Sequence, residues 1–170
     1  RHFHIVDAFI EPRTRGAVTA GVFGLFNELE DVLRGISLIR EFSARTSDLV
    51  VSFGERLSTR LIYEILRAQG VACDYLDART VIKTDAHFGM ATVNFELTNR
   101  LIREHFDKTN ALQLITGFIA STERGETTTL GRGGSDYTGS IVGAALNAEE
   151  IEIWTDVDGM MTADPRKVRN

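Results

Sequence analysis

Hydrophobic positions in the first part of the chain recur every three or four residues, which is the spacing of one buried face of a helix. These apolar positions are Val18, Val22, Leu25, Phe26, Leu29, Val32, Leu33 and Ile36. Gly35 lies inside the run and is expected to bend or end the helix. We therefore expect a mainly helical segment over residues 1–48, with a boundary at residues 43–48.

Beyond that boundary, short apolar runs alternate with amphipathic stretches. The runs predict strands over residues 49–53, 71–76 and 112–119. The amphipathic stretches predict helices over residues 55–69 and 92–106. Such alternation is typical of a mainly parallel sheet that is covered by helices on both faces. The expected fold is therefore α/β, a three-layer α/β/α sandwich over residues 49–170 that follows the helical segment.

A glycine-rich stretch, Thr127-Thr-Thr-Leu-Gly-Arg-Gly-Gly-Ser-Asp136, comes directly before another helical pattern. Gly131, Gly133 and Gly134 allow positive φ angles and close backbone approach, so that successive N–H groups can converge on an anion. The helix N-terminus adds roughly 0.3–1 kcal/mol. This is too little to hold a polyphosphate, which also needs Arg132 and a metal ion or lysine. A plain hairpin turn before a capped helix is the alternative.

The helix after this stretch has apolar positions spaced for one face. They are Ile141, Val142, Ala145 and Leu146. Ser135 or Asp136 is expected to cap the helix, because either side chain can accept hydrogen bonds from N–H groups of the first turn. Further on, residues 151–154 predict a short buried strand. Residues 155–159 predict a polar turn at its carboxyl end, where open α/β sheets bind ligands. An ordinary Asx turn is the alternative for this turn, whereas a calcium loop lacks its other ligands.

The composition favours a soluble cytoplasmic protein. The chain has 170 residues, 43% of them hydrophobic, which is enough for one core. Its single cysteine, Cys73, excludes an internal disulfide and is expected in the core. The formal net charge of −5 and the lack of a basic run argue against a nucleic-acid partner. No apolar stretch reaches the roughly 18 residues of a membrane span, so no membrane partner is expected.

The sequence assigns no residue as a metal ligand. The histidines His2, His4, His87 and His105 lie without a further cluster of ligands, so surface or core roles are preferred to a metal site. The glycine-rich stretch also lacks both the complete dinucleotide fingerprint and the lysine of a P-loop.

Three motifs, in this order and spacing, resemble those of the aspartokinases, members of the amino acid kinase family. They are Val51-Ser-Phe-Gly-Glu-Arg-Leu-Ser58, the stretch 127–136 and Trp154-Thr-Asp-Val-Asp-Gly-Met-Met-Thr-Ala-Asp-Pro-Arg166. The resemblance implies an enzyme that uses ATP and Mg²⁺ to phosphorylate the β-carboxylate of L-aspartate, yielding 4-phospho-L-aspartate. This reaction is the first step of lysine, threonine and methionine biosynthesis. The resemblance also implies a homo-oligomer in the intact protein.

The residues themselves suit an amino acid substrate. Phosphoryl transfer to a carboxylate brings anions together, so catalysis depends mainly on positioning and charge neutralisation. Arg132 can hold a carboxylate through two parallel hydrogen bonds, and Glu55, expected at the end of a strand, can pair with an ammonium group. Each residue also has an interpretation without a ligand. Glu55 would then be a carboxylate stabilised by a helix N-terminus, and Arg132 would be a solvated charge in a loop.

The resemblance implies a role for each candidate site residue. The residues implied to contact the substrate are Glu55, Arg132, Ser135 and Asp136, of which Asp136 is also the catalytic candidate. The residues implied to contact the nucleotide are Thr155, Asp156 and Arg166. Met161 stands where some relatives carry an aromatic residue, which leaves the packing around the adenine open.

The chain begins at Arg1 without a methionine. The resemblance implies that a strand and a glycine-rich turn with a phosphate-binding lysine precede such a segment. We therefore expect a fragment truncated at both ends and inactive by itself. Two other functions stay open, namely another amino acid kinase, such as a glutamate kinase, and a non-catalytic amino-acid-binding regulatory module. Aspartate binding without turnover would favour the module.

Overall fold

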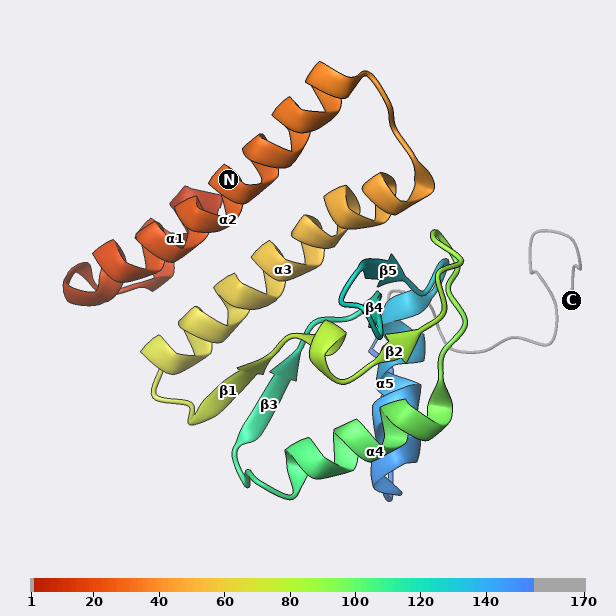
Figure 1. Cartoon of the computed structure of the whole chain (residues 1–170). Helices are drawn as coiled ribbons and strands as arrows, with labels where there is room; N and C mark the ends of the chain where they lie inside the picture. Colours follow the sequence, from red (N-terminus) through yellow and green to blue (C-terminus); the bar gives the residue numbers. More distant parts are fainter. Residues whose placement is uncertain (1, 155–170) are drawn as a thin grey trace, which may run out of the picture.

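The structure, a computed structural model, describes residues 2–154 (Figure 1). Its helices are α1 (His2–Phe9), α2 (Pro12–Ile39), α3 (Ala44–Ala68), α4 (Phe95–Phe106) and α5 (Gly134–Leu146), with a 3-10 turn η1 (Ala78–Thr80). Its strands are β1 (Cys73–Leu76), β2 (Lys83–Thr84), β3 (Leu112–Ile115), β4 (Ile119–Thr122) and β5 (Thr127–Thr129). Helices α1 to α3 lie on one side of the strands, and α4 and α5 lie on the other (Figure 1). The expected α/β fold with helices on both faces is confirmed.

The first layer consists of α1, α2 and α3 and has an apolar core of its own. The buried residues of this core are Val6, Ile10, Val18, Val22, Leu57 and Leu61. Gly35 does not end α2, because the helix continues to Ile39. The helix ends instead at Arg40, which has a left-handed φ of 57°. Residues 40–43 connect α2 to α3, close to the expected boundary at residues 43–48, and the division into two domain segments stays a prediction.

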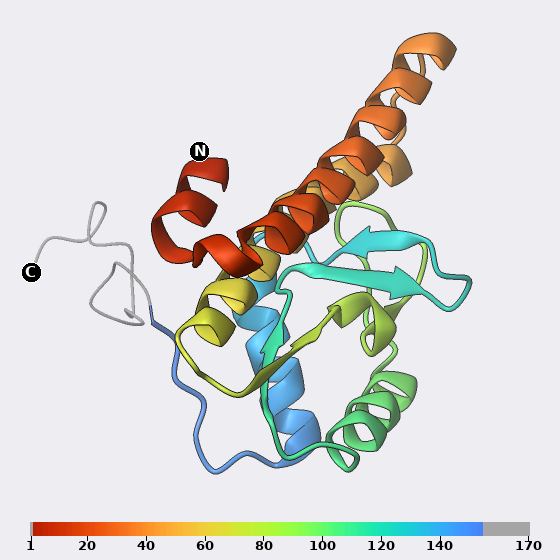
Figure 2. The same cartoon turned by 90° about the vertical axis from the view of Figure 1, so that its left-hand side faces the viewer.

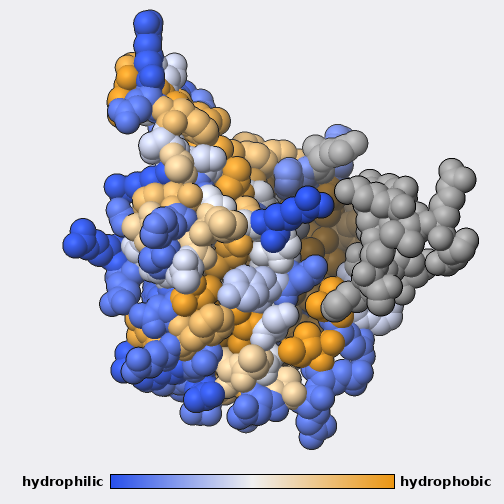
Figure 3. Space-filling model, turned by 90° about the vertical axis from the view of Figure 1, so that its right-hand side faces the viewer, coloured by the Kyte–Doolittle hydropathy of each residue, from blue (hydrophilic) through white to orange (hydrophobic). Residues whose placement is uncertain are grey.

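The end of α2 projects beyond the α/β body (Figure 2). Leu38 is 85% exposed there and Ile39 is 72% exposed. Hydrophobic side chains also reach the surface at the top of the space-filling view, where this end lies (Figure 3). Among residues 2–154, no helix is both long enough and apolar enough to cross a membrane.

Helix α3 includes residues 49–53, so the strand predicted for them is wrong. The helix begins at its N-cap Ser43, whose side chain accepts a hydrogen bond from the Thr46 N–H at 3.2 Å. Its buried face includes Asp48 and Ser52 as well as apolar residues. Two polar residues at core positions hid the helical period from a pattern based on hydrophobicity. The helix predicted over residues 55–69 is confirmed as the second half of α3, and Gly70, with a φ of 83°, follows its end.

The strands form two small sheets. In the first, β1 pairs in parallel with β3, and Cys73 lies opposite Leu112. In the second, β4 lies between β2, to which it is parallel, and β5, to which it is antiparallel. The strand predicted over residues 112–119 is therefore divided, because β3 and β4 belong to different sheets. The break contains Phe118, whose φ of 66° is rare for a residue other than glycine.

Residues 151–154 do not form the buried strand that the sequence predicts. They have no secondary structure, and Trp154 is 90% exposed. No strand among the described residues pairs with them. The prediction of α4 is confirmed, although the helix begins at Phe95 behind its N-cap Asn94 rather than at residue 92. Cys73 is 2% exposed, as expected of a core residue.

A second core lies between the strands and helices α4 and α5. Its buried residues are Leu76, Ala78, Val81, Ile82, Val93, Ile102, Ala120, Leu130, Ile141 and Ala145. The chain leaves this core at Leu130 and turns directly into the glycine-rich segment before α5. The core thus fixes both ends of the segment that carries most of the candidate site residues.

Candidate functional site

The glycine-rich turn between β5 and α5 forms one wall of a pocket of about 390 Å³. The residues that line the pocket are Phe118, Gly131, Arg132, Gly133, Gly134, Ser135 and Asp136. Gly131 and Gly133 have φ angles of 75° and 72°, a conformation that other residues rarely adopt. The turn therefore requires glycine at these two positions, as expected. Three candidate residues, Arg132, Ser135 and Asp136, meet in this pocket.

The cap of α5 differs from the prediction. Gly133 is the N-cap residue and no side chain caps the helix, so neither Ser135 nor Asp136 has the expected capping role. The reason is the left-handed backbone of Gly133, which places residues 134–136 inside the first helical turn. The side chains of Ser135 and Asp136 are exposed at the pocket. Neither side chain is therefore engaged in a capping hydrogen bond at the pocket.

A second turn, at Gly117 and Phe118, packs tightly against the first. A Cβ atom on Gly117 would lie 2.8 Å from the Ser135 Oγ, and one on Gly134 would lie 2.7 Å from the Phe118 ring. Thr138 joins the two turns, because its Oγ1 accepts a hydrogen bond from the Phe118 N–H at 3.0 Å and donates one to the Gly134 carbonyl at 2.8 Å. The β3–β4 turn and the start of α5 thus form one rigid unit.

Glu55 reaches the same unit from α3. The backbone N–H of Gly117 lies next to its half-buried carboxylate and favours the ionised form. Burial raises the pKa of Glu55, and the Gly117 N–H offsets part of that rise. Glu55 and Ser135 therefore both contact Gly117, although Glu55 is not among the residues that line the pocket. Gly117 is a residue of the site that the sequence motifs missed.

Glu55 does not lie at the end of a strand, as the sequence predicted. It lies within α3, about three turns after the helix begins at Ala44. The alternative role, a carboxylate favoured by a helix N-terminus, fails for the same reason, because that effect is confined to the first turn. Glu55 is instead a half-buried carboxylate next to Gly117. A cation bound beside it would stabilise its ionised form.

Asp48, another residue that the motifs missed, is a buried hydrogen-bond acceptor on α3. It is 2% exposed and accepts hydrogen bonds from the N–H groups of Gly89 and Thr129, at 2.8 and 3.0 Å. It also accepts one from the Thr129 hydroxyl at 2.8 Å. The spacing of Asp48, Ser52 and Glu55 could have indicated that these polar residues lie together on one face of a helix.

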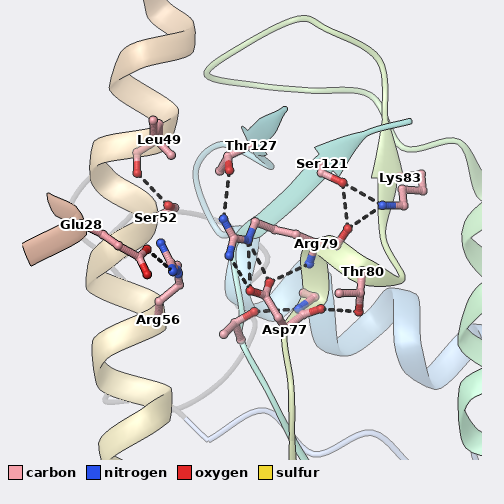
Figure 4. Close-up of polar contacts among 12 residues, drawn as sticks. Glu28, Leu49, Ser52, Arg56, Asp77, Arg79, Thr80, Lys83, Ser121 and Thr127 are labelled. Atoms are coloured by element: carbon pink, nitrogen blue, oxygen red, sulfur yellow. Dashed lines mark hydrogen bonds and ion pairs between the residues drawn. The ribbon is translucent and has the colours of Figure 1, made fainter. Parts of the chain in front are cut away.

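A network of charged residues supports the opposite end of β5 (Figure 4). Arg79 forms an ion pair with Asp77 at 2.6 Å and donates a hydrogen bond to the Thr127 hydroxyl at 3.1 Å. Burial raises the pKa of Asp77, but its hydrogen bonds and ion pair with Arg79 outweigh this and hold the pKa below its usual range. Burial lowers the pKa of Lys83, whose amino group donates to the Arg79 carbonyl and the Ser121 hydroxyl. None of these residues lines the pocket.

A larger hollow, of about 480 Å³, lies at the start of α3. Arg45 and Glu126 line it and form an ion pair at 3.2 Å. It contains none of the candidate site residues. Within residues 2–154, no cluster of three or more histidine, cysteine or acidic side chains could hold a metal ion. The expected nucleotide residues Thr155, Asp156 and Arg166 lie outside the described part of the chain.

Residues 13–170 match the amino acid kinase family, and the chain belongs to this family. It is similar to lysine-sensitive aspartokinase 3 of Escherichia coli K12, with 41% identity over 83% of this chain and 33% of the relative. It is also similar to the aspartokinase of Schizosaccharomyces pombe, with 36% identity over 83% of this chain and 28% of the relative. The chain thus spans about a third, or less, of these curated relatives.

Solved structures give the same result. The structure of E. coli aspartokinase III in complex with lysine and aspartate, in the T-state, matches 97% of this chain and 36% of that chain, with a TM-score of 0.86 and 35% identity. The structure of the same enzyme in complex with aspartate and ADP, in the R-state, matches 98% of this chain and 43% of that chain, with a TM-score of 0.72 and 34% identity. The resemblance to aspartokinases that the three motifs predict is confirmed.

Proposed function

We propose that the protein carrying this chain transfers the γ-phosphoryl group of ATP to the β-carboxylate of L-aspartate and so produces 4-phospho-L-aspartate. The reaction would be the first step toward lysine, threonine and methionine. The observation that supports it most strongly is the meeting of opposite charges at one rigid unit, with Arg132 in the pocket and Glu55 on Gly117. A free amino acid carries the two complementary charges, and the similar proteins are named aspartokinases.

In this proposal, Arg132 holds a substrate carboxylate through its planar guanidinium group. Glu55 pairs with the substrate ammonium group, which lowers the pKa of the half-buried carboxylate again because a positive neighbour favours the ionised form. Ser135 donates its hydroxyl hydrogen to a substrate oxygen. Asp136, in the first turn of α5, acts on the reacting end of the substrate as the catalytic residue.

Thr155, Asp156 and Arg166 are proposed to contact the nucleotide. Membership of a kinase family implies ATP as the phosphoryl donor, and a bound Mg²⁺ ion would neutralise charge on its phosphates. The N-terminus of α5, which begins behind its N-cap Gly133, favours a negatively charged group at the turn. A homo-oligomer also stays a prediction. So does a cytoplasmic location, since several relatives from Arabidopsis thaliana are named chloroplastic.

The test is the substitution Arg132→Ala in the native protein at its full natural length. Loss of a charged hydrogen-bond pair costs about 1.5–3 kcal/mol, so we expect the KM for aspartate to rise roughly 10- to 150-fold while the KM for ATP changes little. Arg132→Lys should rescue poorly, because an ammonium group lacks the planar fork. Arg124→Ala, at an exposed arginine outside the pocket, is the matched control.

Equal losses in both KM values would show that Arg132 is structural or binds phosphate. Preferred phosphorylation of glutamate would instead favour the glutamate kinase alternative. Tight aspartate binding without turnover would favour the regulatory module. An assay of the 170-residue chain beside the longer protein tests the expectation that the chain is inactive by itself.

A further inference from the structure

Asp48 and Glu55 lie on the same face of α3. They are seven residues apart, and seven residues turn an α-helix by almost two full turns. Both carboxylates reach the α/β body, Glu55 at Gly117 and Asp48 at Thr129. Helix α3 thus contacts the α/β body at two places, Gly117 and Thr129.

The partners of Asp48 lead directly to the glycine-rich turn. Thr129 is the last residue of β5 and comes three residues before Arg132. Gly89, the other donor, precedes Met90, whose Cγ lies 3.1 Å from the position of a Cβ on Gly131. The Ala91 N–H donates to the Thr129 carbonyl at 2.9 Å, so residues 89–91 are held between Asp48 and the turn. One carboxylate therefore fastens α3, β5 and this loop together.

We propose that Asp48 is a positioning residue that sets the distance between Glu55 and Arg132. This inference rests on the proposed function, in which these two residues hold opposite ends of an amino acid. Apolar packing alone allows small shifts, whereas the three hydrogen bonds of the buried Asp48 carboxylate fix distance and direction. Another polar link from α3, the ion pair of Arg45 with Glu126 next to β5, is partly exposed and contributes little.

The chemistry of the contact provides graded variants. In Asp48→Asn, the amide oxygen can accept both backbone N–H groups, while the amide nitrogen donates to the Thr129 hydroxyl. The contact then survives. Asp48→Leu removes all three acceptors, and Thr129→Val removes only the hydroxyl donor. Thr98→Val is the matched control, because Thr98 is also fully buried and hydrogen-bonded, to Lys83 on β2, yet joins neither α3 nor the turn.

The experiment measures both KM values in the native protein at its full natural length. A displacement of about 1 Å at a reacting group can cost on the order of 100-fold. We expect Asp48→Leu to raise the KM for aspartate by at least about tenfold more than the KM for ATP. The KM for aspartate of Thr129→Val should lie between those of the wild type and Asp48→Leu. The KM for aspartate of Asp48→Asn should stay within about threefold of the wild-type value. Thr98→Val should change both KM values alike.

A second measurement does not depend on the substrate. Amide hydrogen exchange of residues 130–134 should accelerate in Asp48→Leu and Thr129→Val, but not in Thr98→Val. If Asp48→Leu does not fold, Thr129→Val carries both measurements. Equal changes in both KM values together with unchanged exchange at the turn would overturn the positioning role. A wild-type protein that does not use aspartate contradicts the proposed function alone, because the exchange measurement still decides whether Asp48 positions the turn.

Discussion

The helical layer and the α/β body bury different kinds of side chain. The core of the helical layer is apolar. In the α/β body, an apolar core is interleaved with buried hydroxyl groups, and α3, which contacts β1 and β5 of that body, adds the buried Asp48, Ser52 and Thr59. Within the described part of the chain, every buried polar residue lies at or after position 48. These residues are Asp48, Ser52, Thr59, Thr84, Thr98, Thr116, Ser121, Thr122, Thr127, Thr128, Thr129 and Thr138.

The difference follows from what each region does. Apolar contacts are not directional, so they hold helices together without fixing their angles closely. Hydrogen bonds in a medium from which water is excluded do fix angles and distances, and an unpaired group there is costly. The buried side-chain N and O atoms of the described residues all have partners. The site proposed here to hold both ends of an amino acid needs the second kind of core.

The largest expected effect on stability comes from creating a cavity in each of the two apolar cores. Ile102→Ala, in the α/β body, should lower the free energy of unfolding by about 3–5 kcal/mol, because the surrounding strands and helices cannot close the cavity. Leu61→Ala, in the helical layer, should cost about 2–3 kcal/mol, since helices can move together. Urea denaturation of both variants measures the difference. A reversed order would mean that the helical layer is the more rigid region.

The next effect concerns the buried hydroxyls of the body. The hydroxyl groups of Thr84 and Thr128 lie 2.8 Å apart. Thr84→Val should cost roughly 1–3 kcal/mol, because it leaves the buried Thr128 hydroxyl without this partner. The double variant, with valine at both positions, should cost clearly less than the sum of the single ones. A double-mutant cycle by thermal or urea unfolding measures this coupling, and additive losses would show that the pair contributes no directional contact.

The smallest effect depends on pH. Burial raises the pKa of Glu55 in the folded protein, so the folded state binds that proton more tightly than the unfolded state does. Stability is therefore lost as the pH rises through the folded pKa. Glu55→Gln should be slightly more stable than the wild type at pH 7, and this gain should vanish below roughly pH 4. Unfolding measured at both pH values, with the exposed Glu150→Gln as control, tests the sign.

The same contrast explains which parts of the fold the sequence could predict. Helix α2 follows from its apolar spacing, because its buried side is apolar throughout. The strand expected at residues 49–53 fails since Asp48 and Ser52 occupy core positions of α3. The break at Phe118 carries no local signal, because its positive φ is imposed by the packing of Thr138 and Gly134 around it. Patterns based on hydrophobicity are therefore least informative where polar groups are buried.

The candidate site divides in the same way. Arg132, Ser135 and Asp136 meet because they are neighbours in one turn whose glycines are required by positive φ angles. The motifs also named Glu55, but its contact with Gly117 depends on how α3 lies against the β3–β4 turn. Neither Gly117 nor Asp48 belongs to a chemical motif. Their importance follows from close backbone packing and buried hydrogen bonds, which a single sequence does not display.

The burial of Cys73 makes its thiol an internal reporter of opening motions. The chain has one cysteine, which lies in β1 opposite Leu112 of β3 and is 2% exposed. A thiol reagent can react with it only after this part of the molecule opens, so the labelling rate reports one event at one known place. Labelling much faster than global unfolding would reveal that β1 and β3 separate while the rest of the protein stays folded. The chain thus provides its own probe of local stability, without any engineered label.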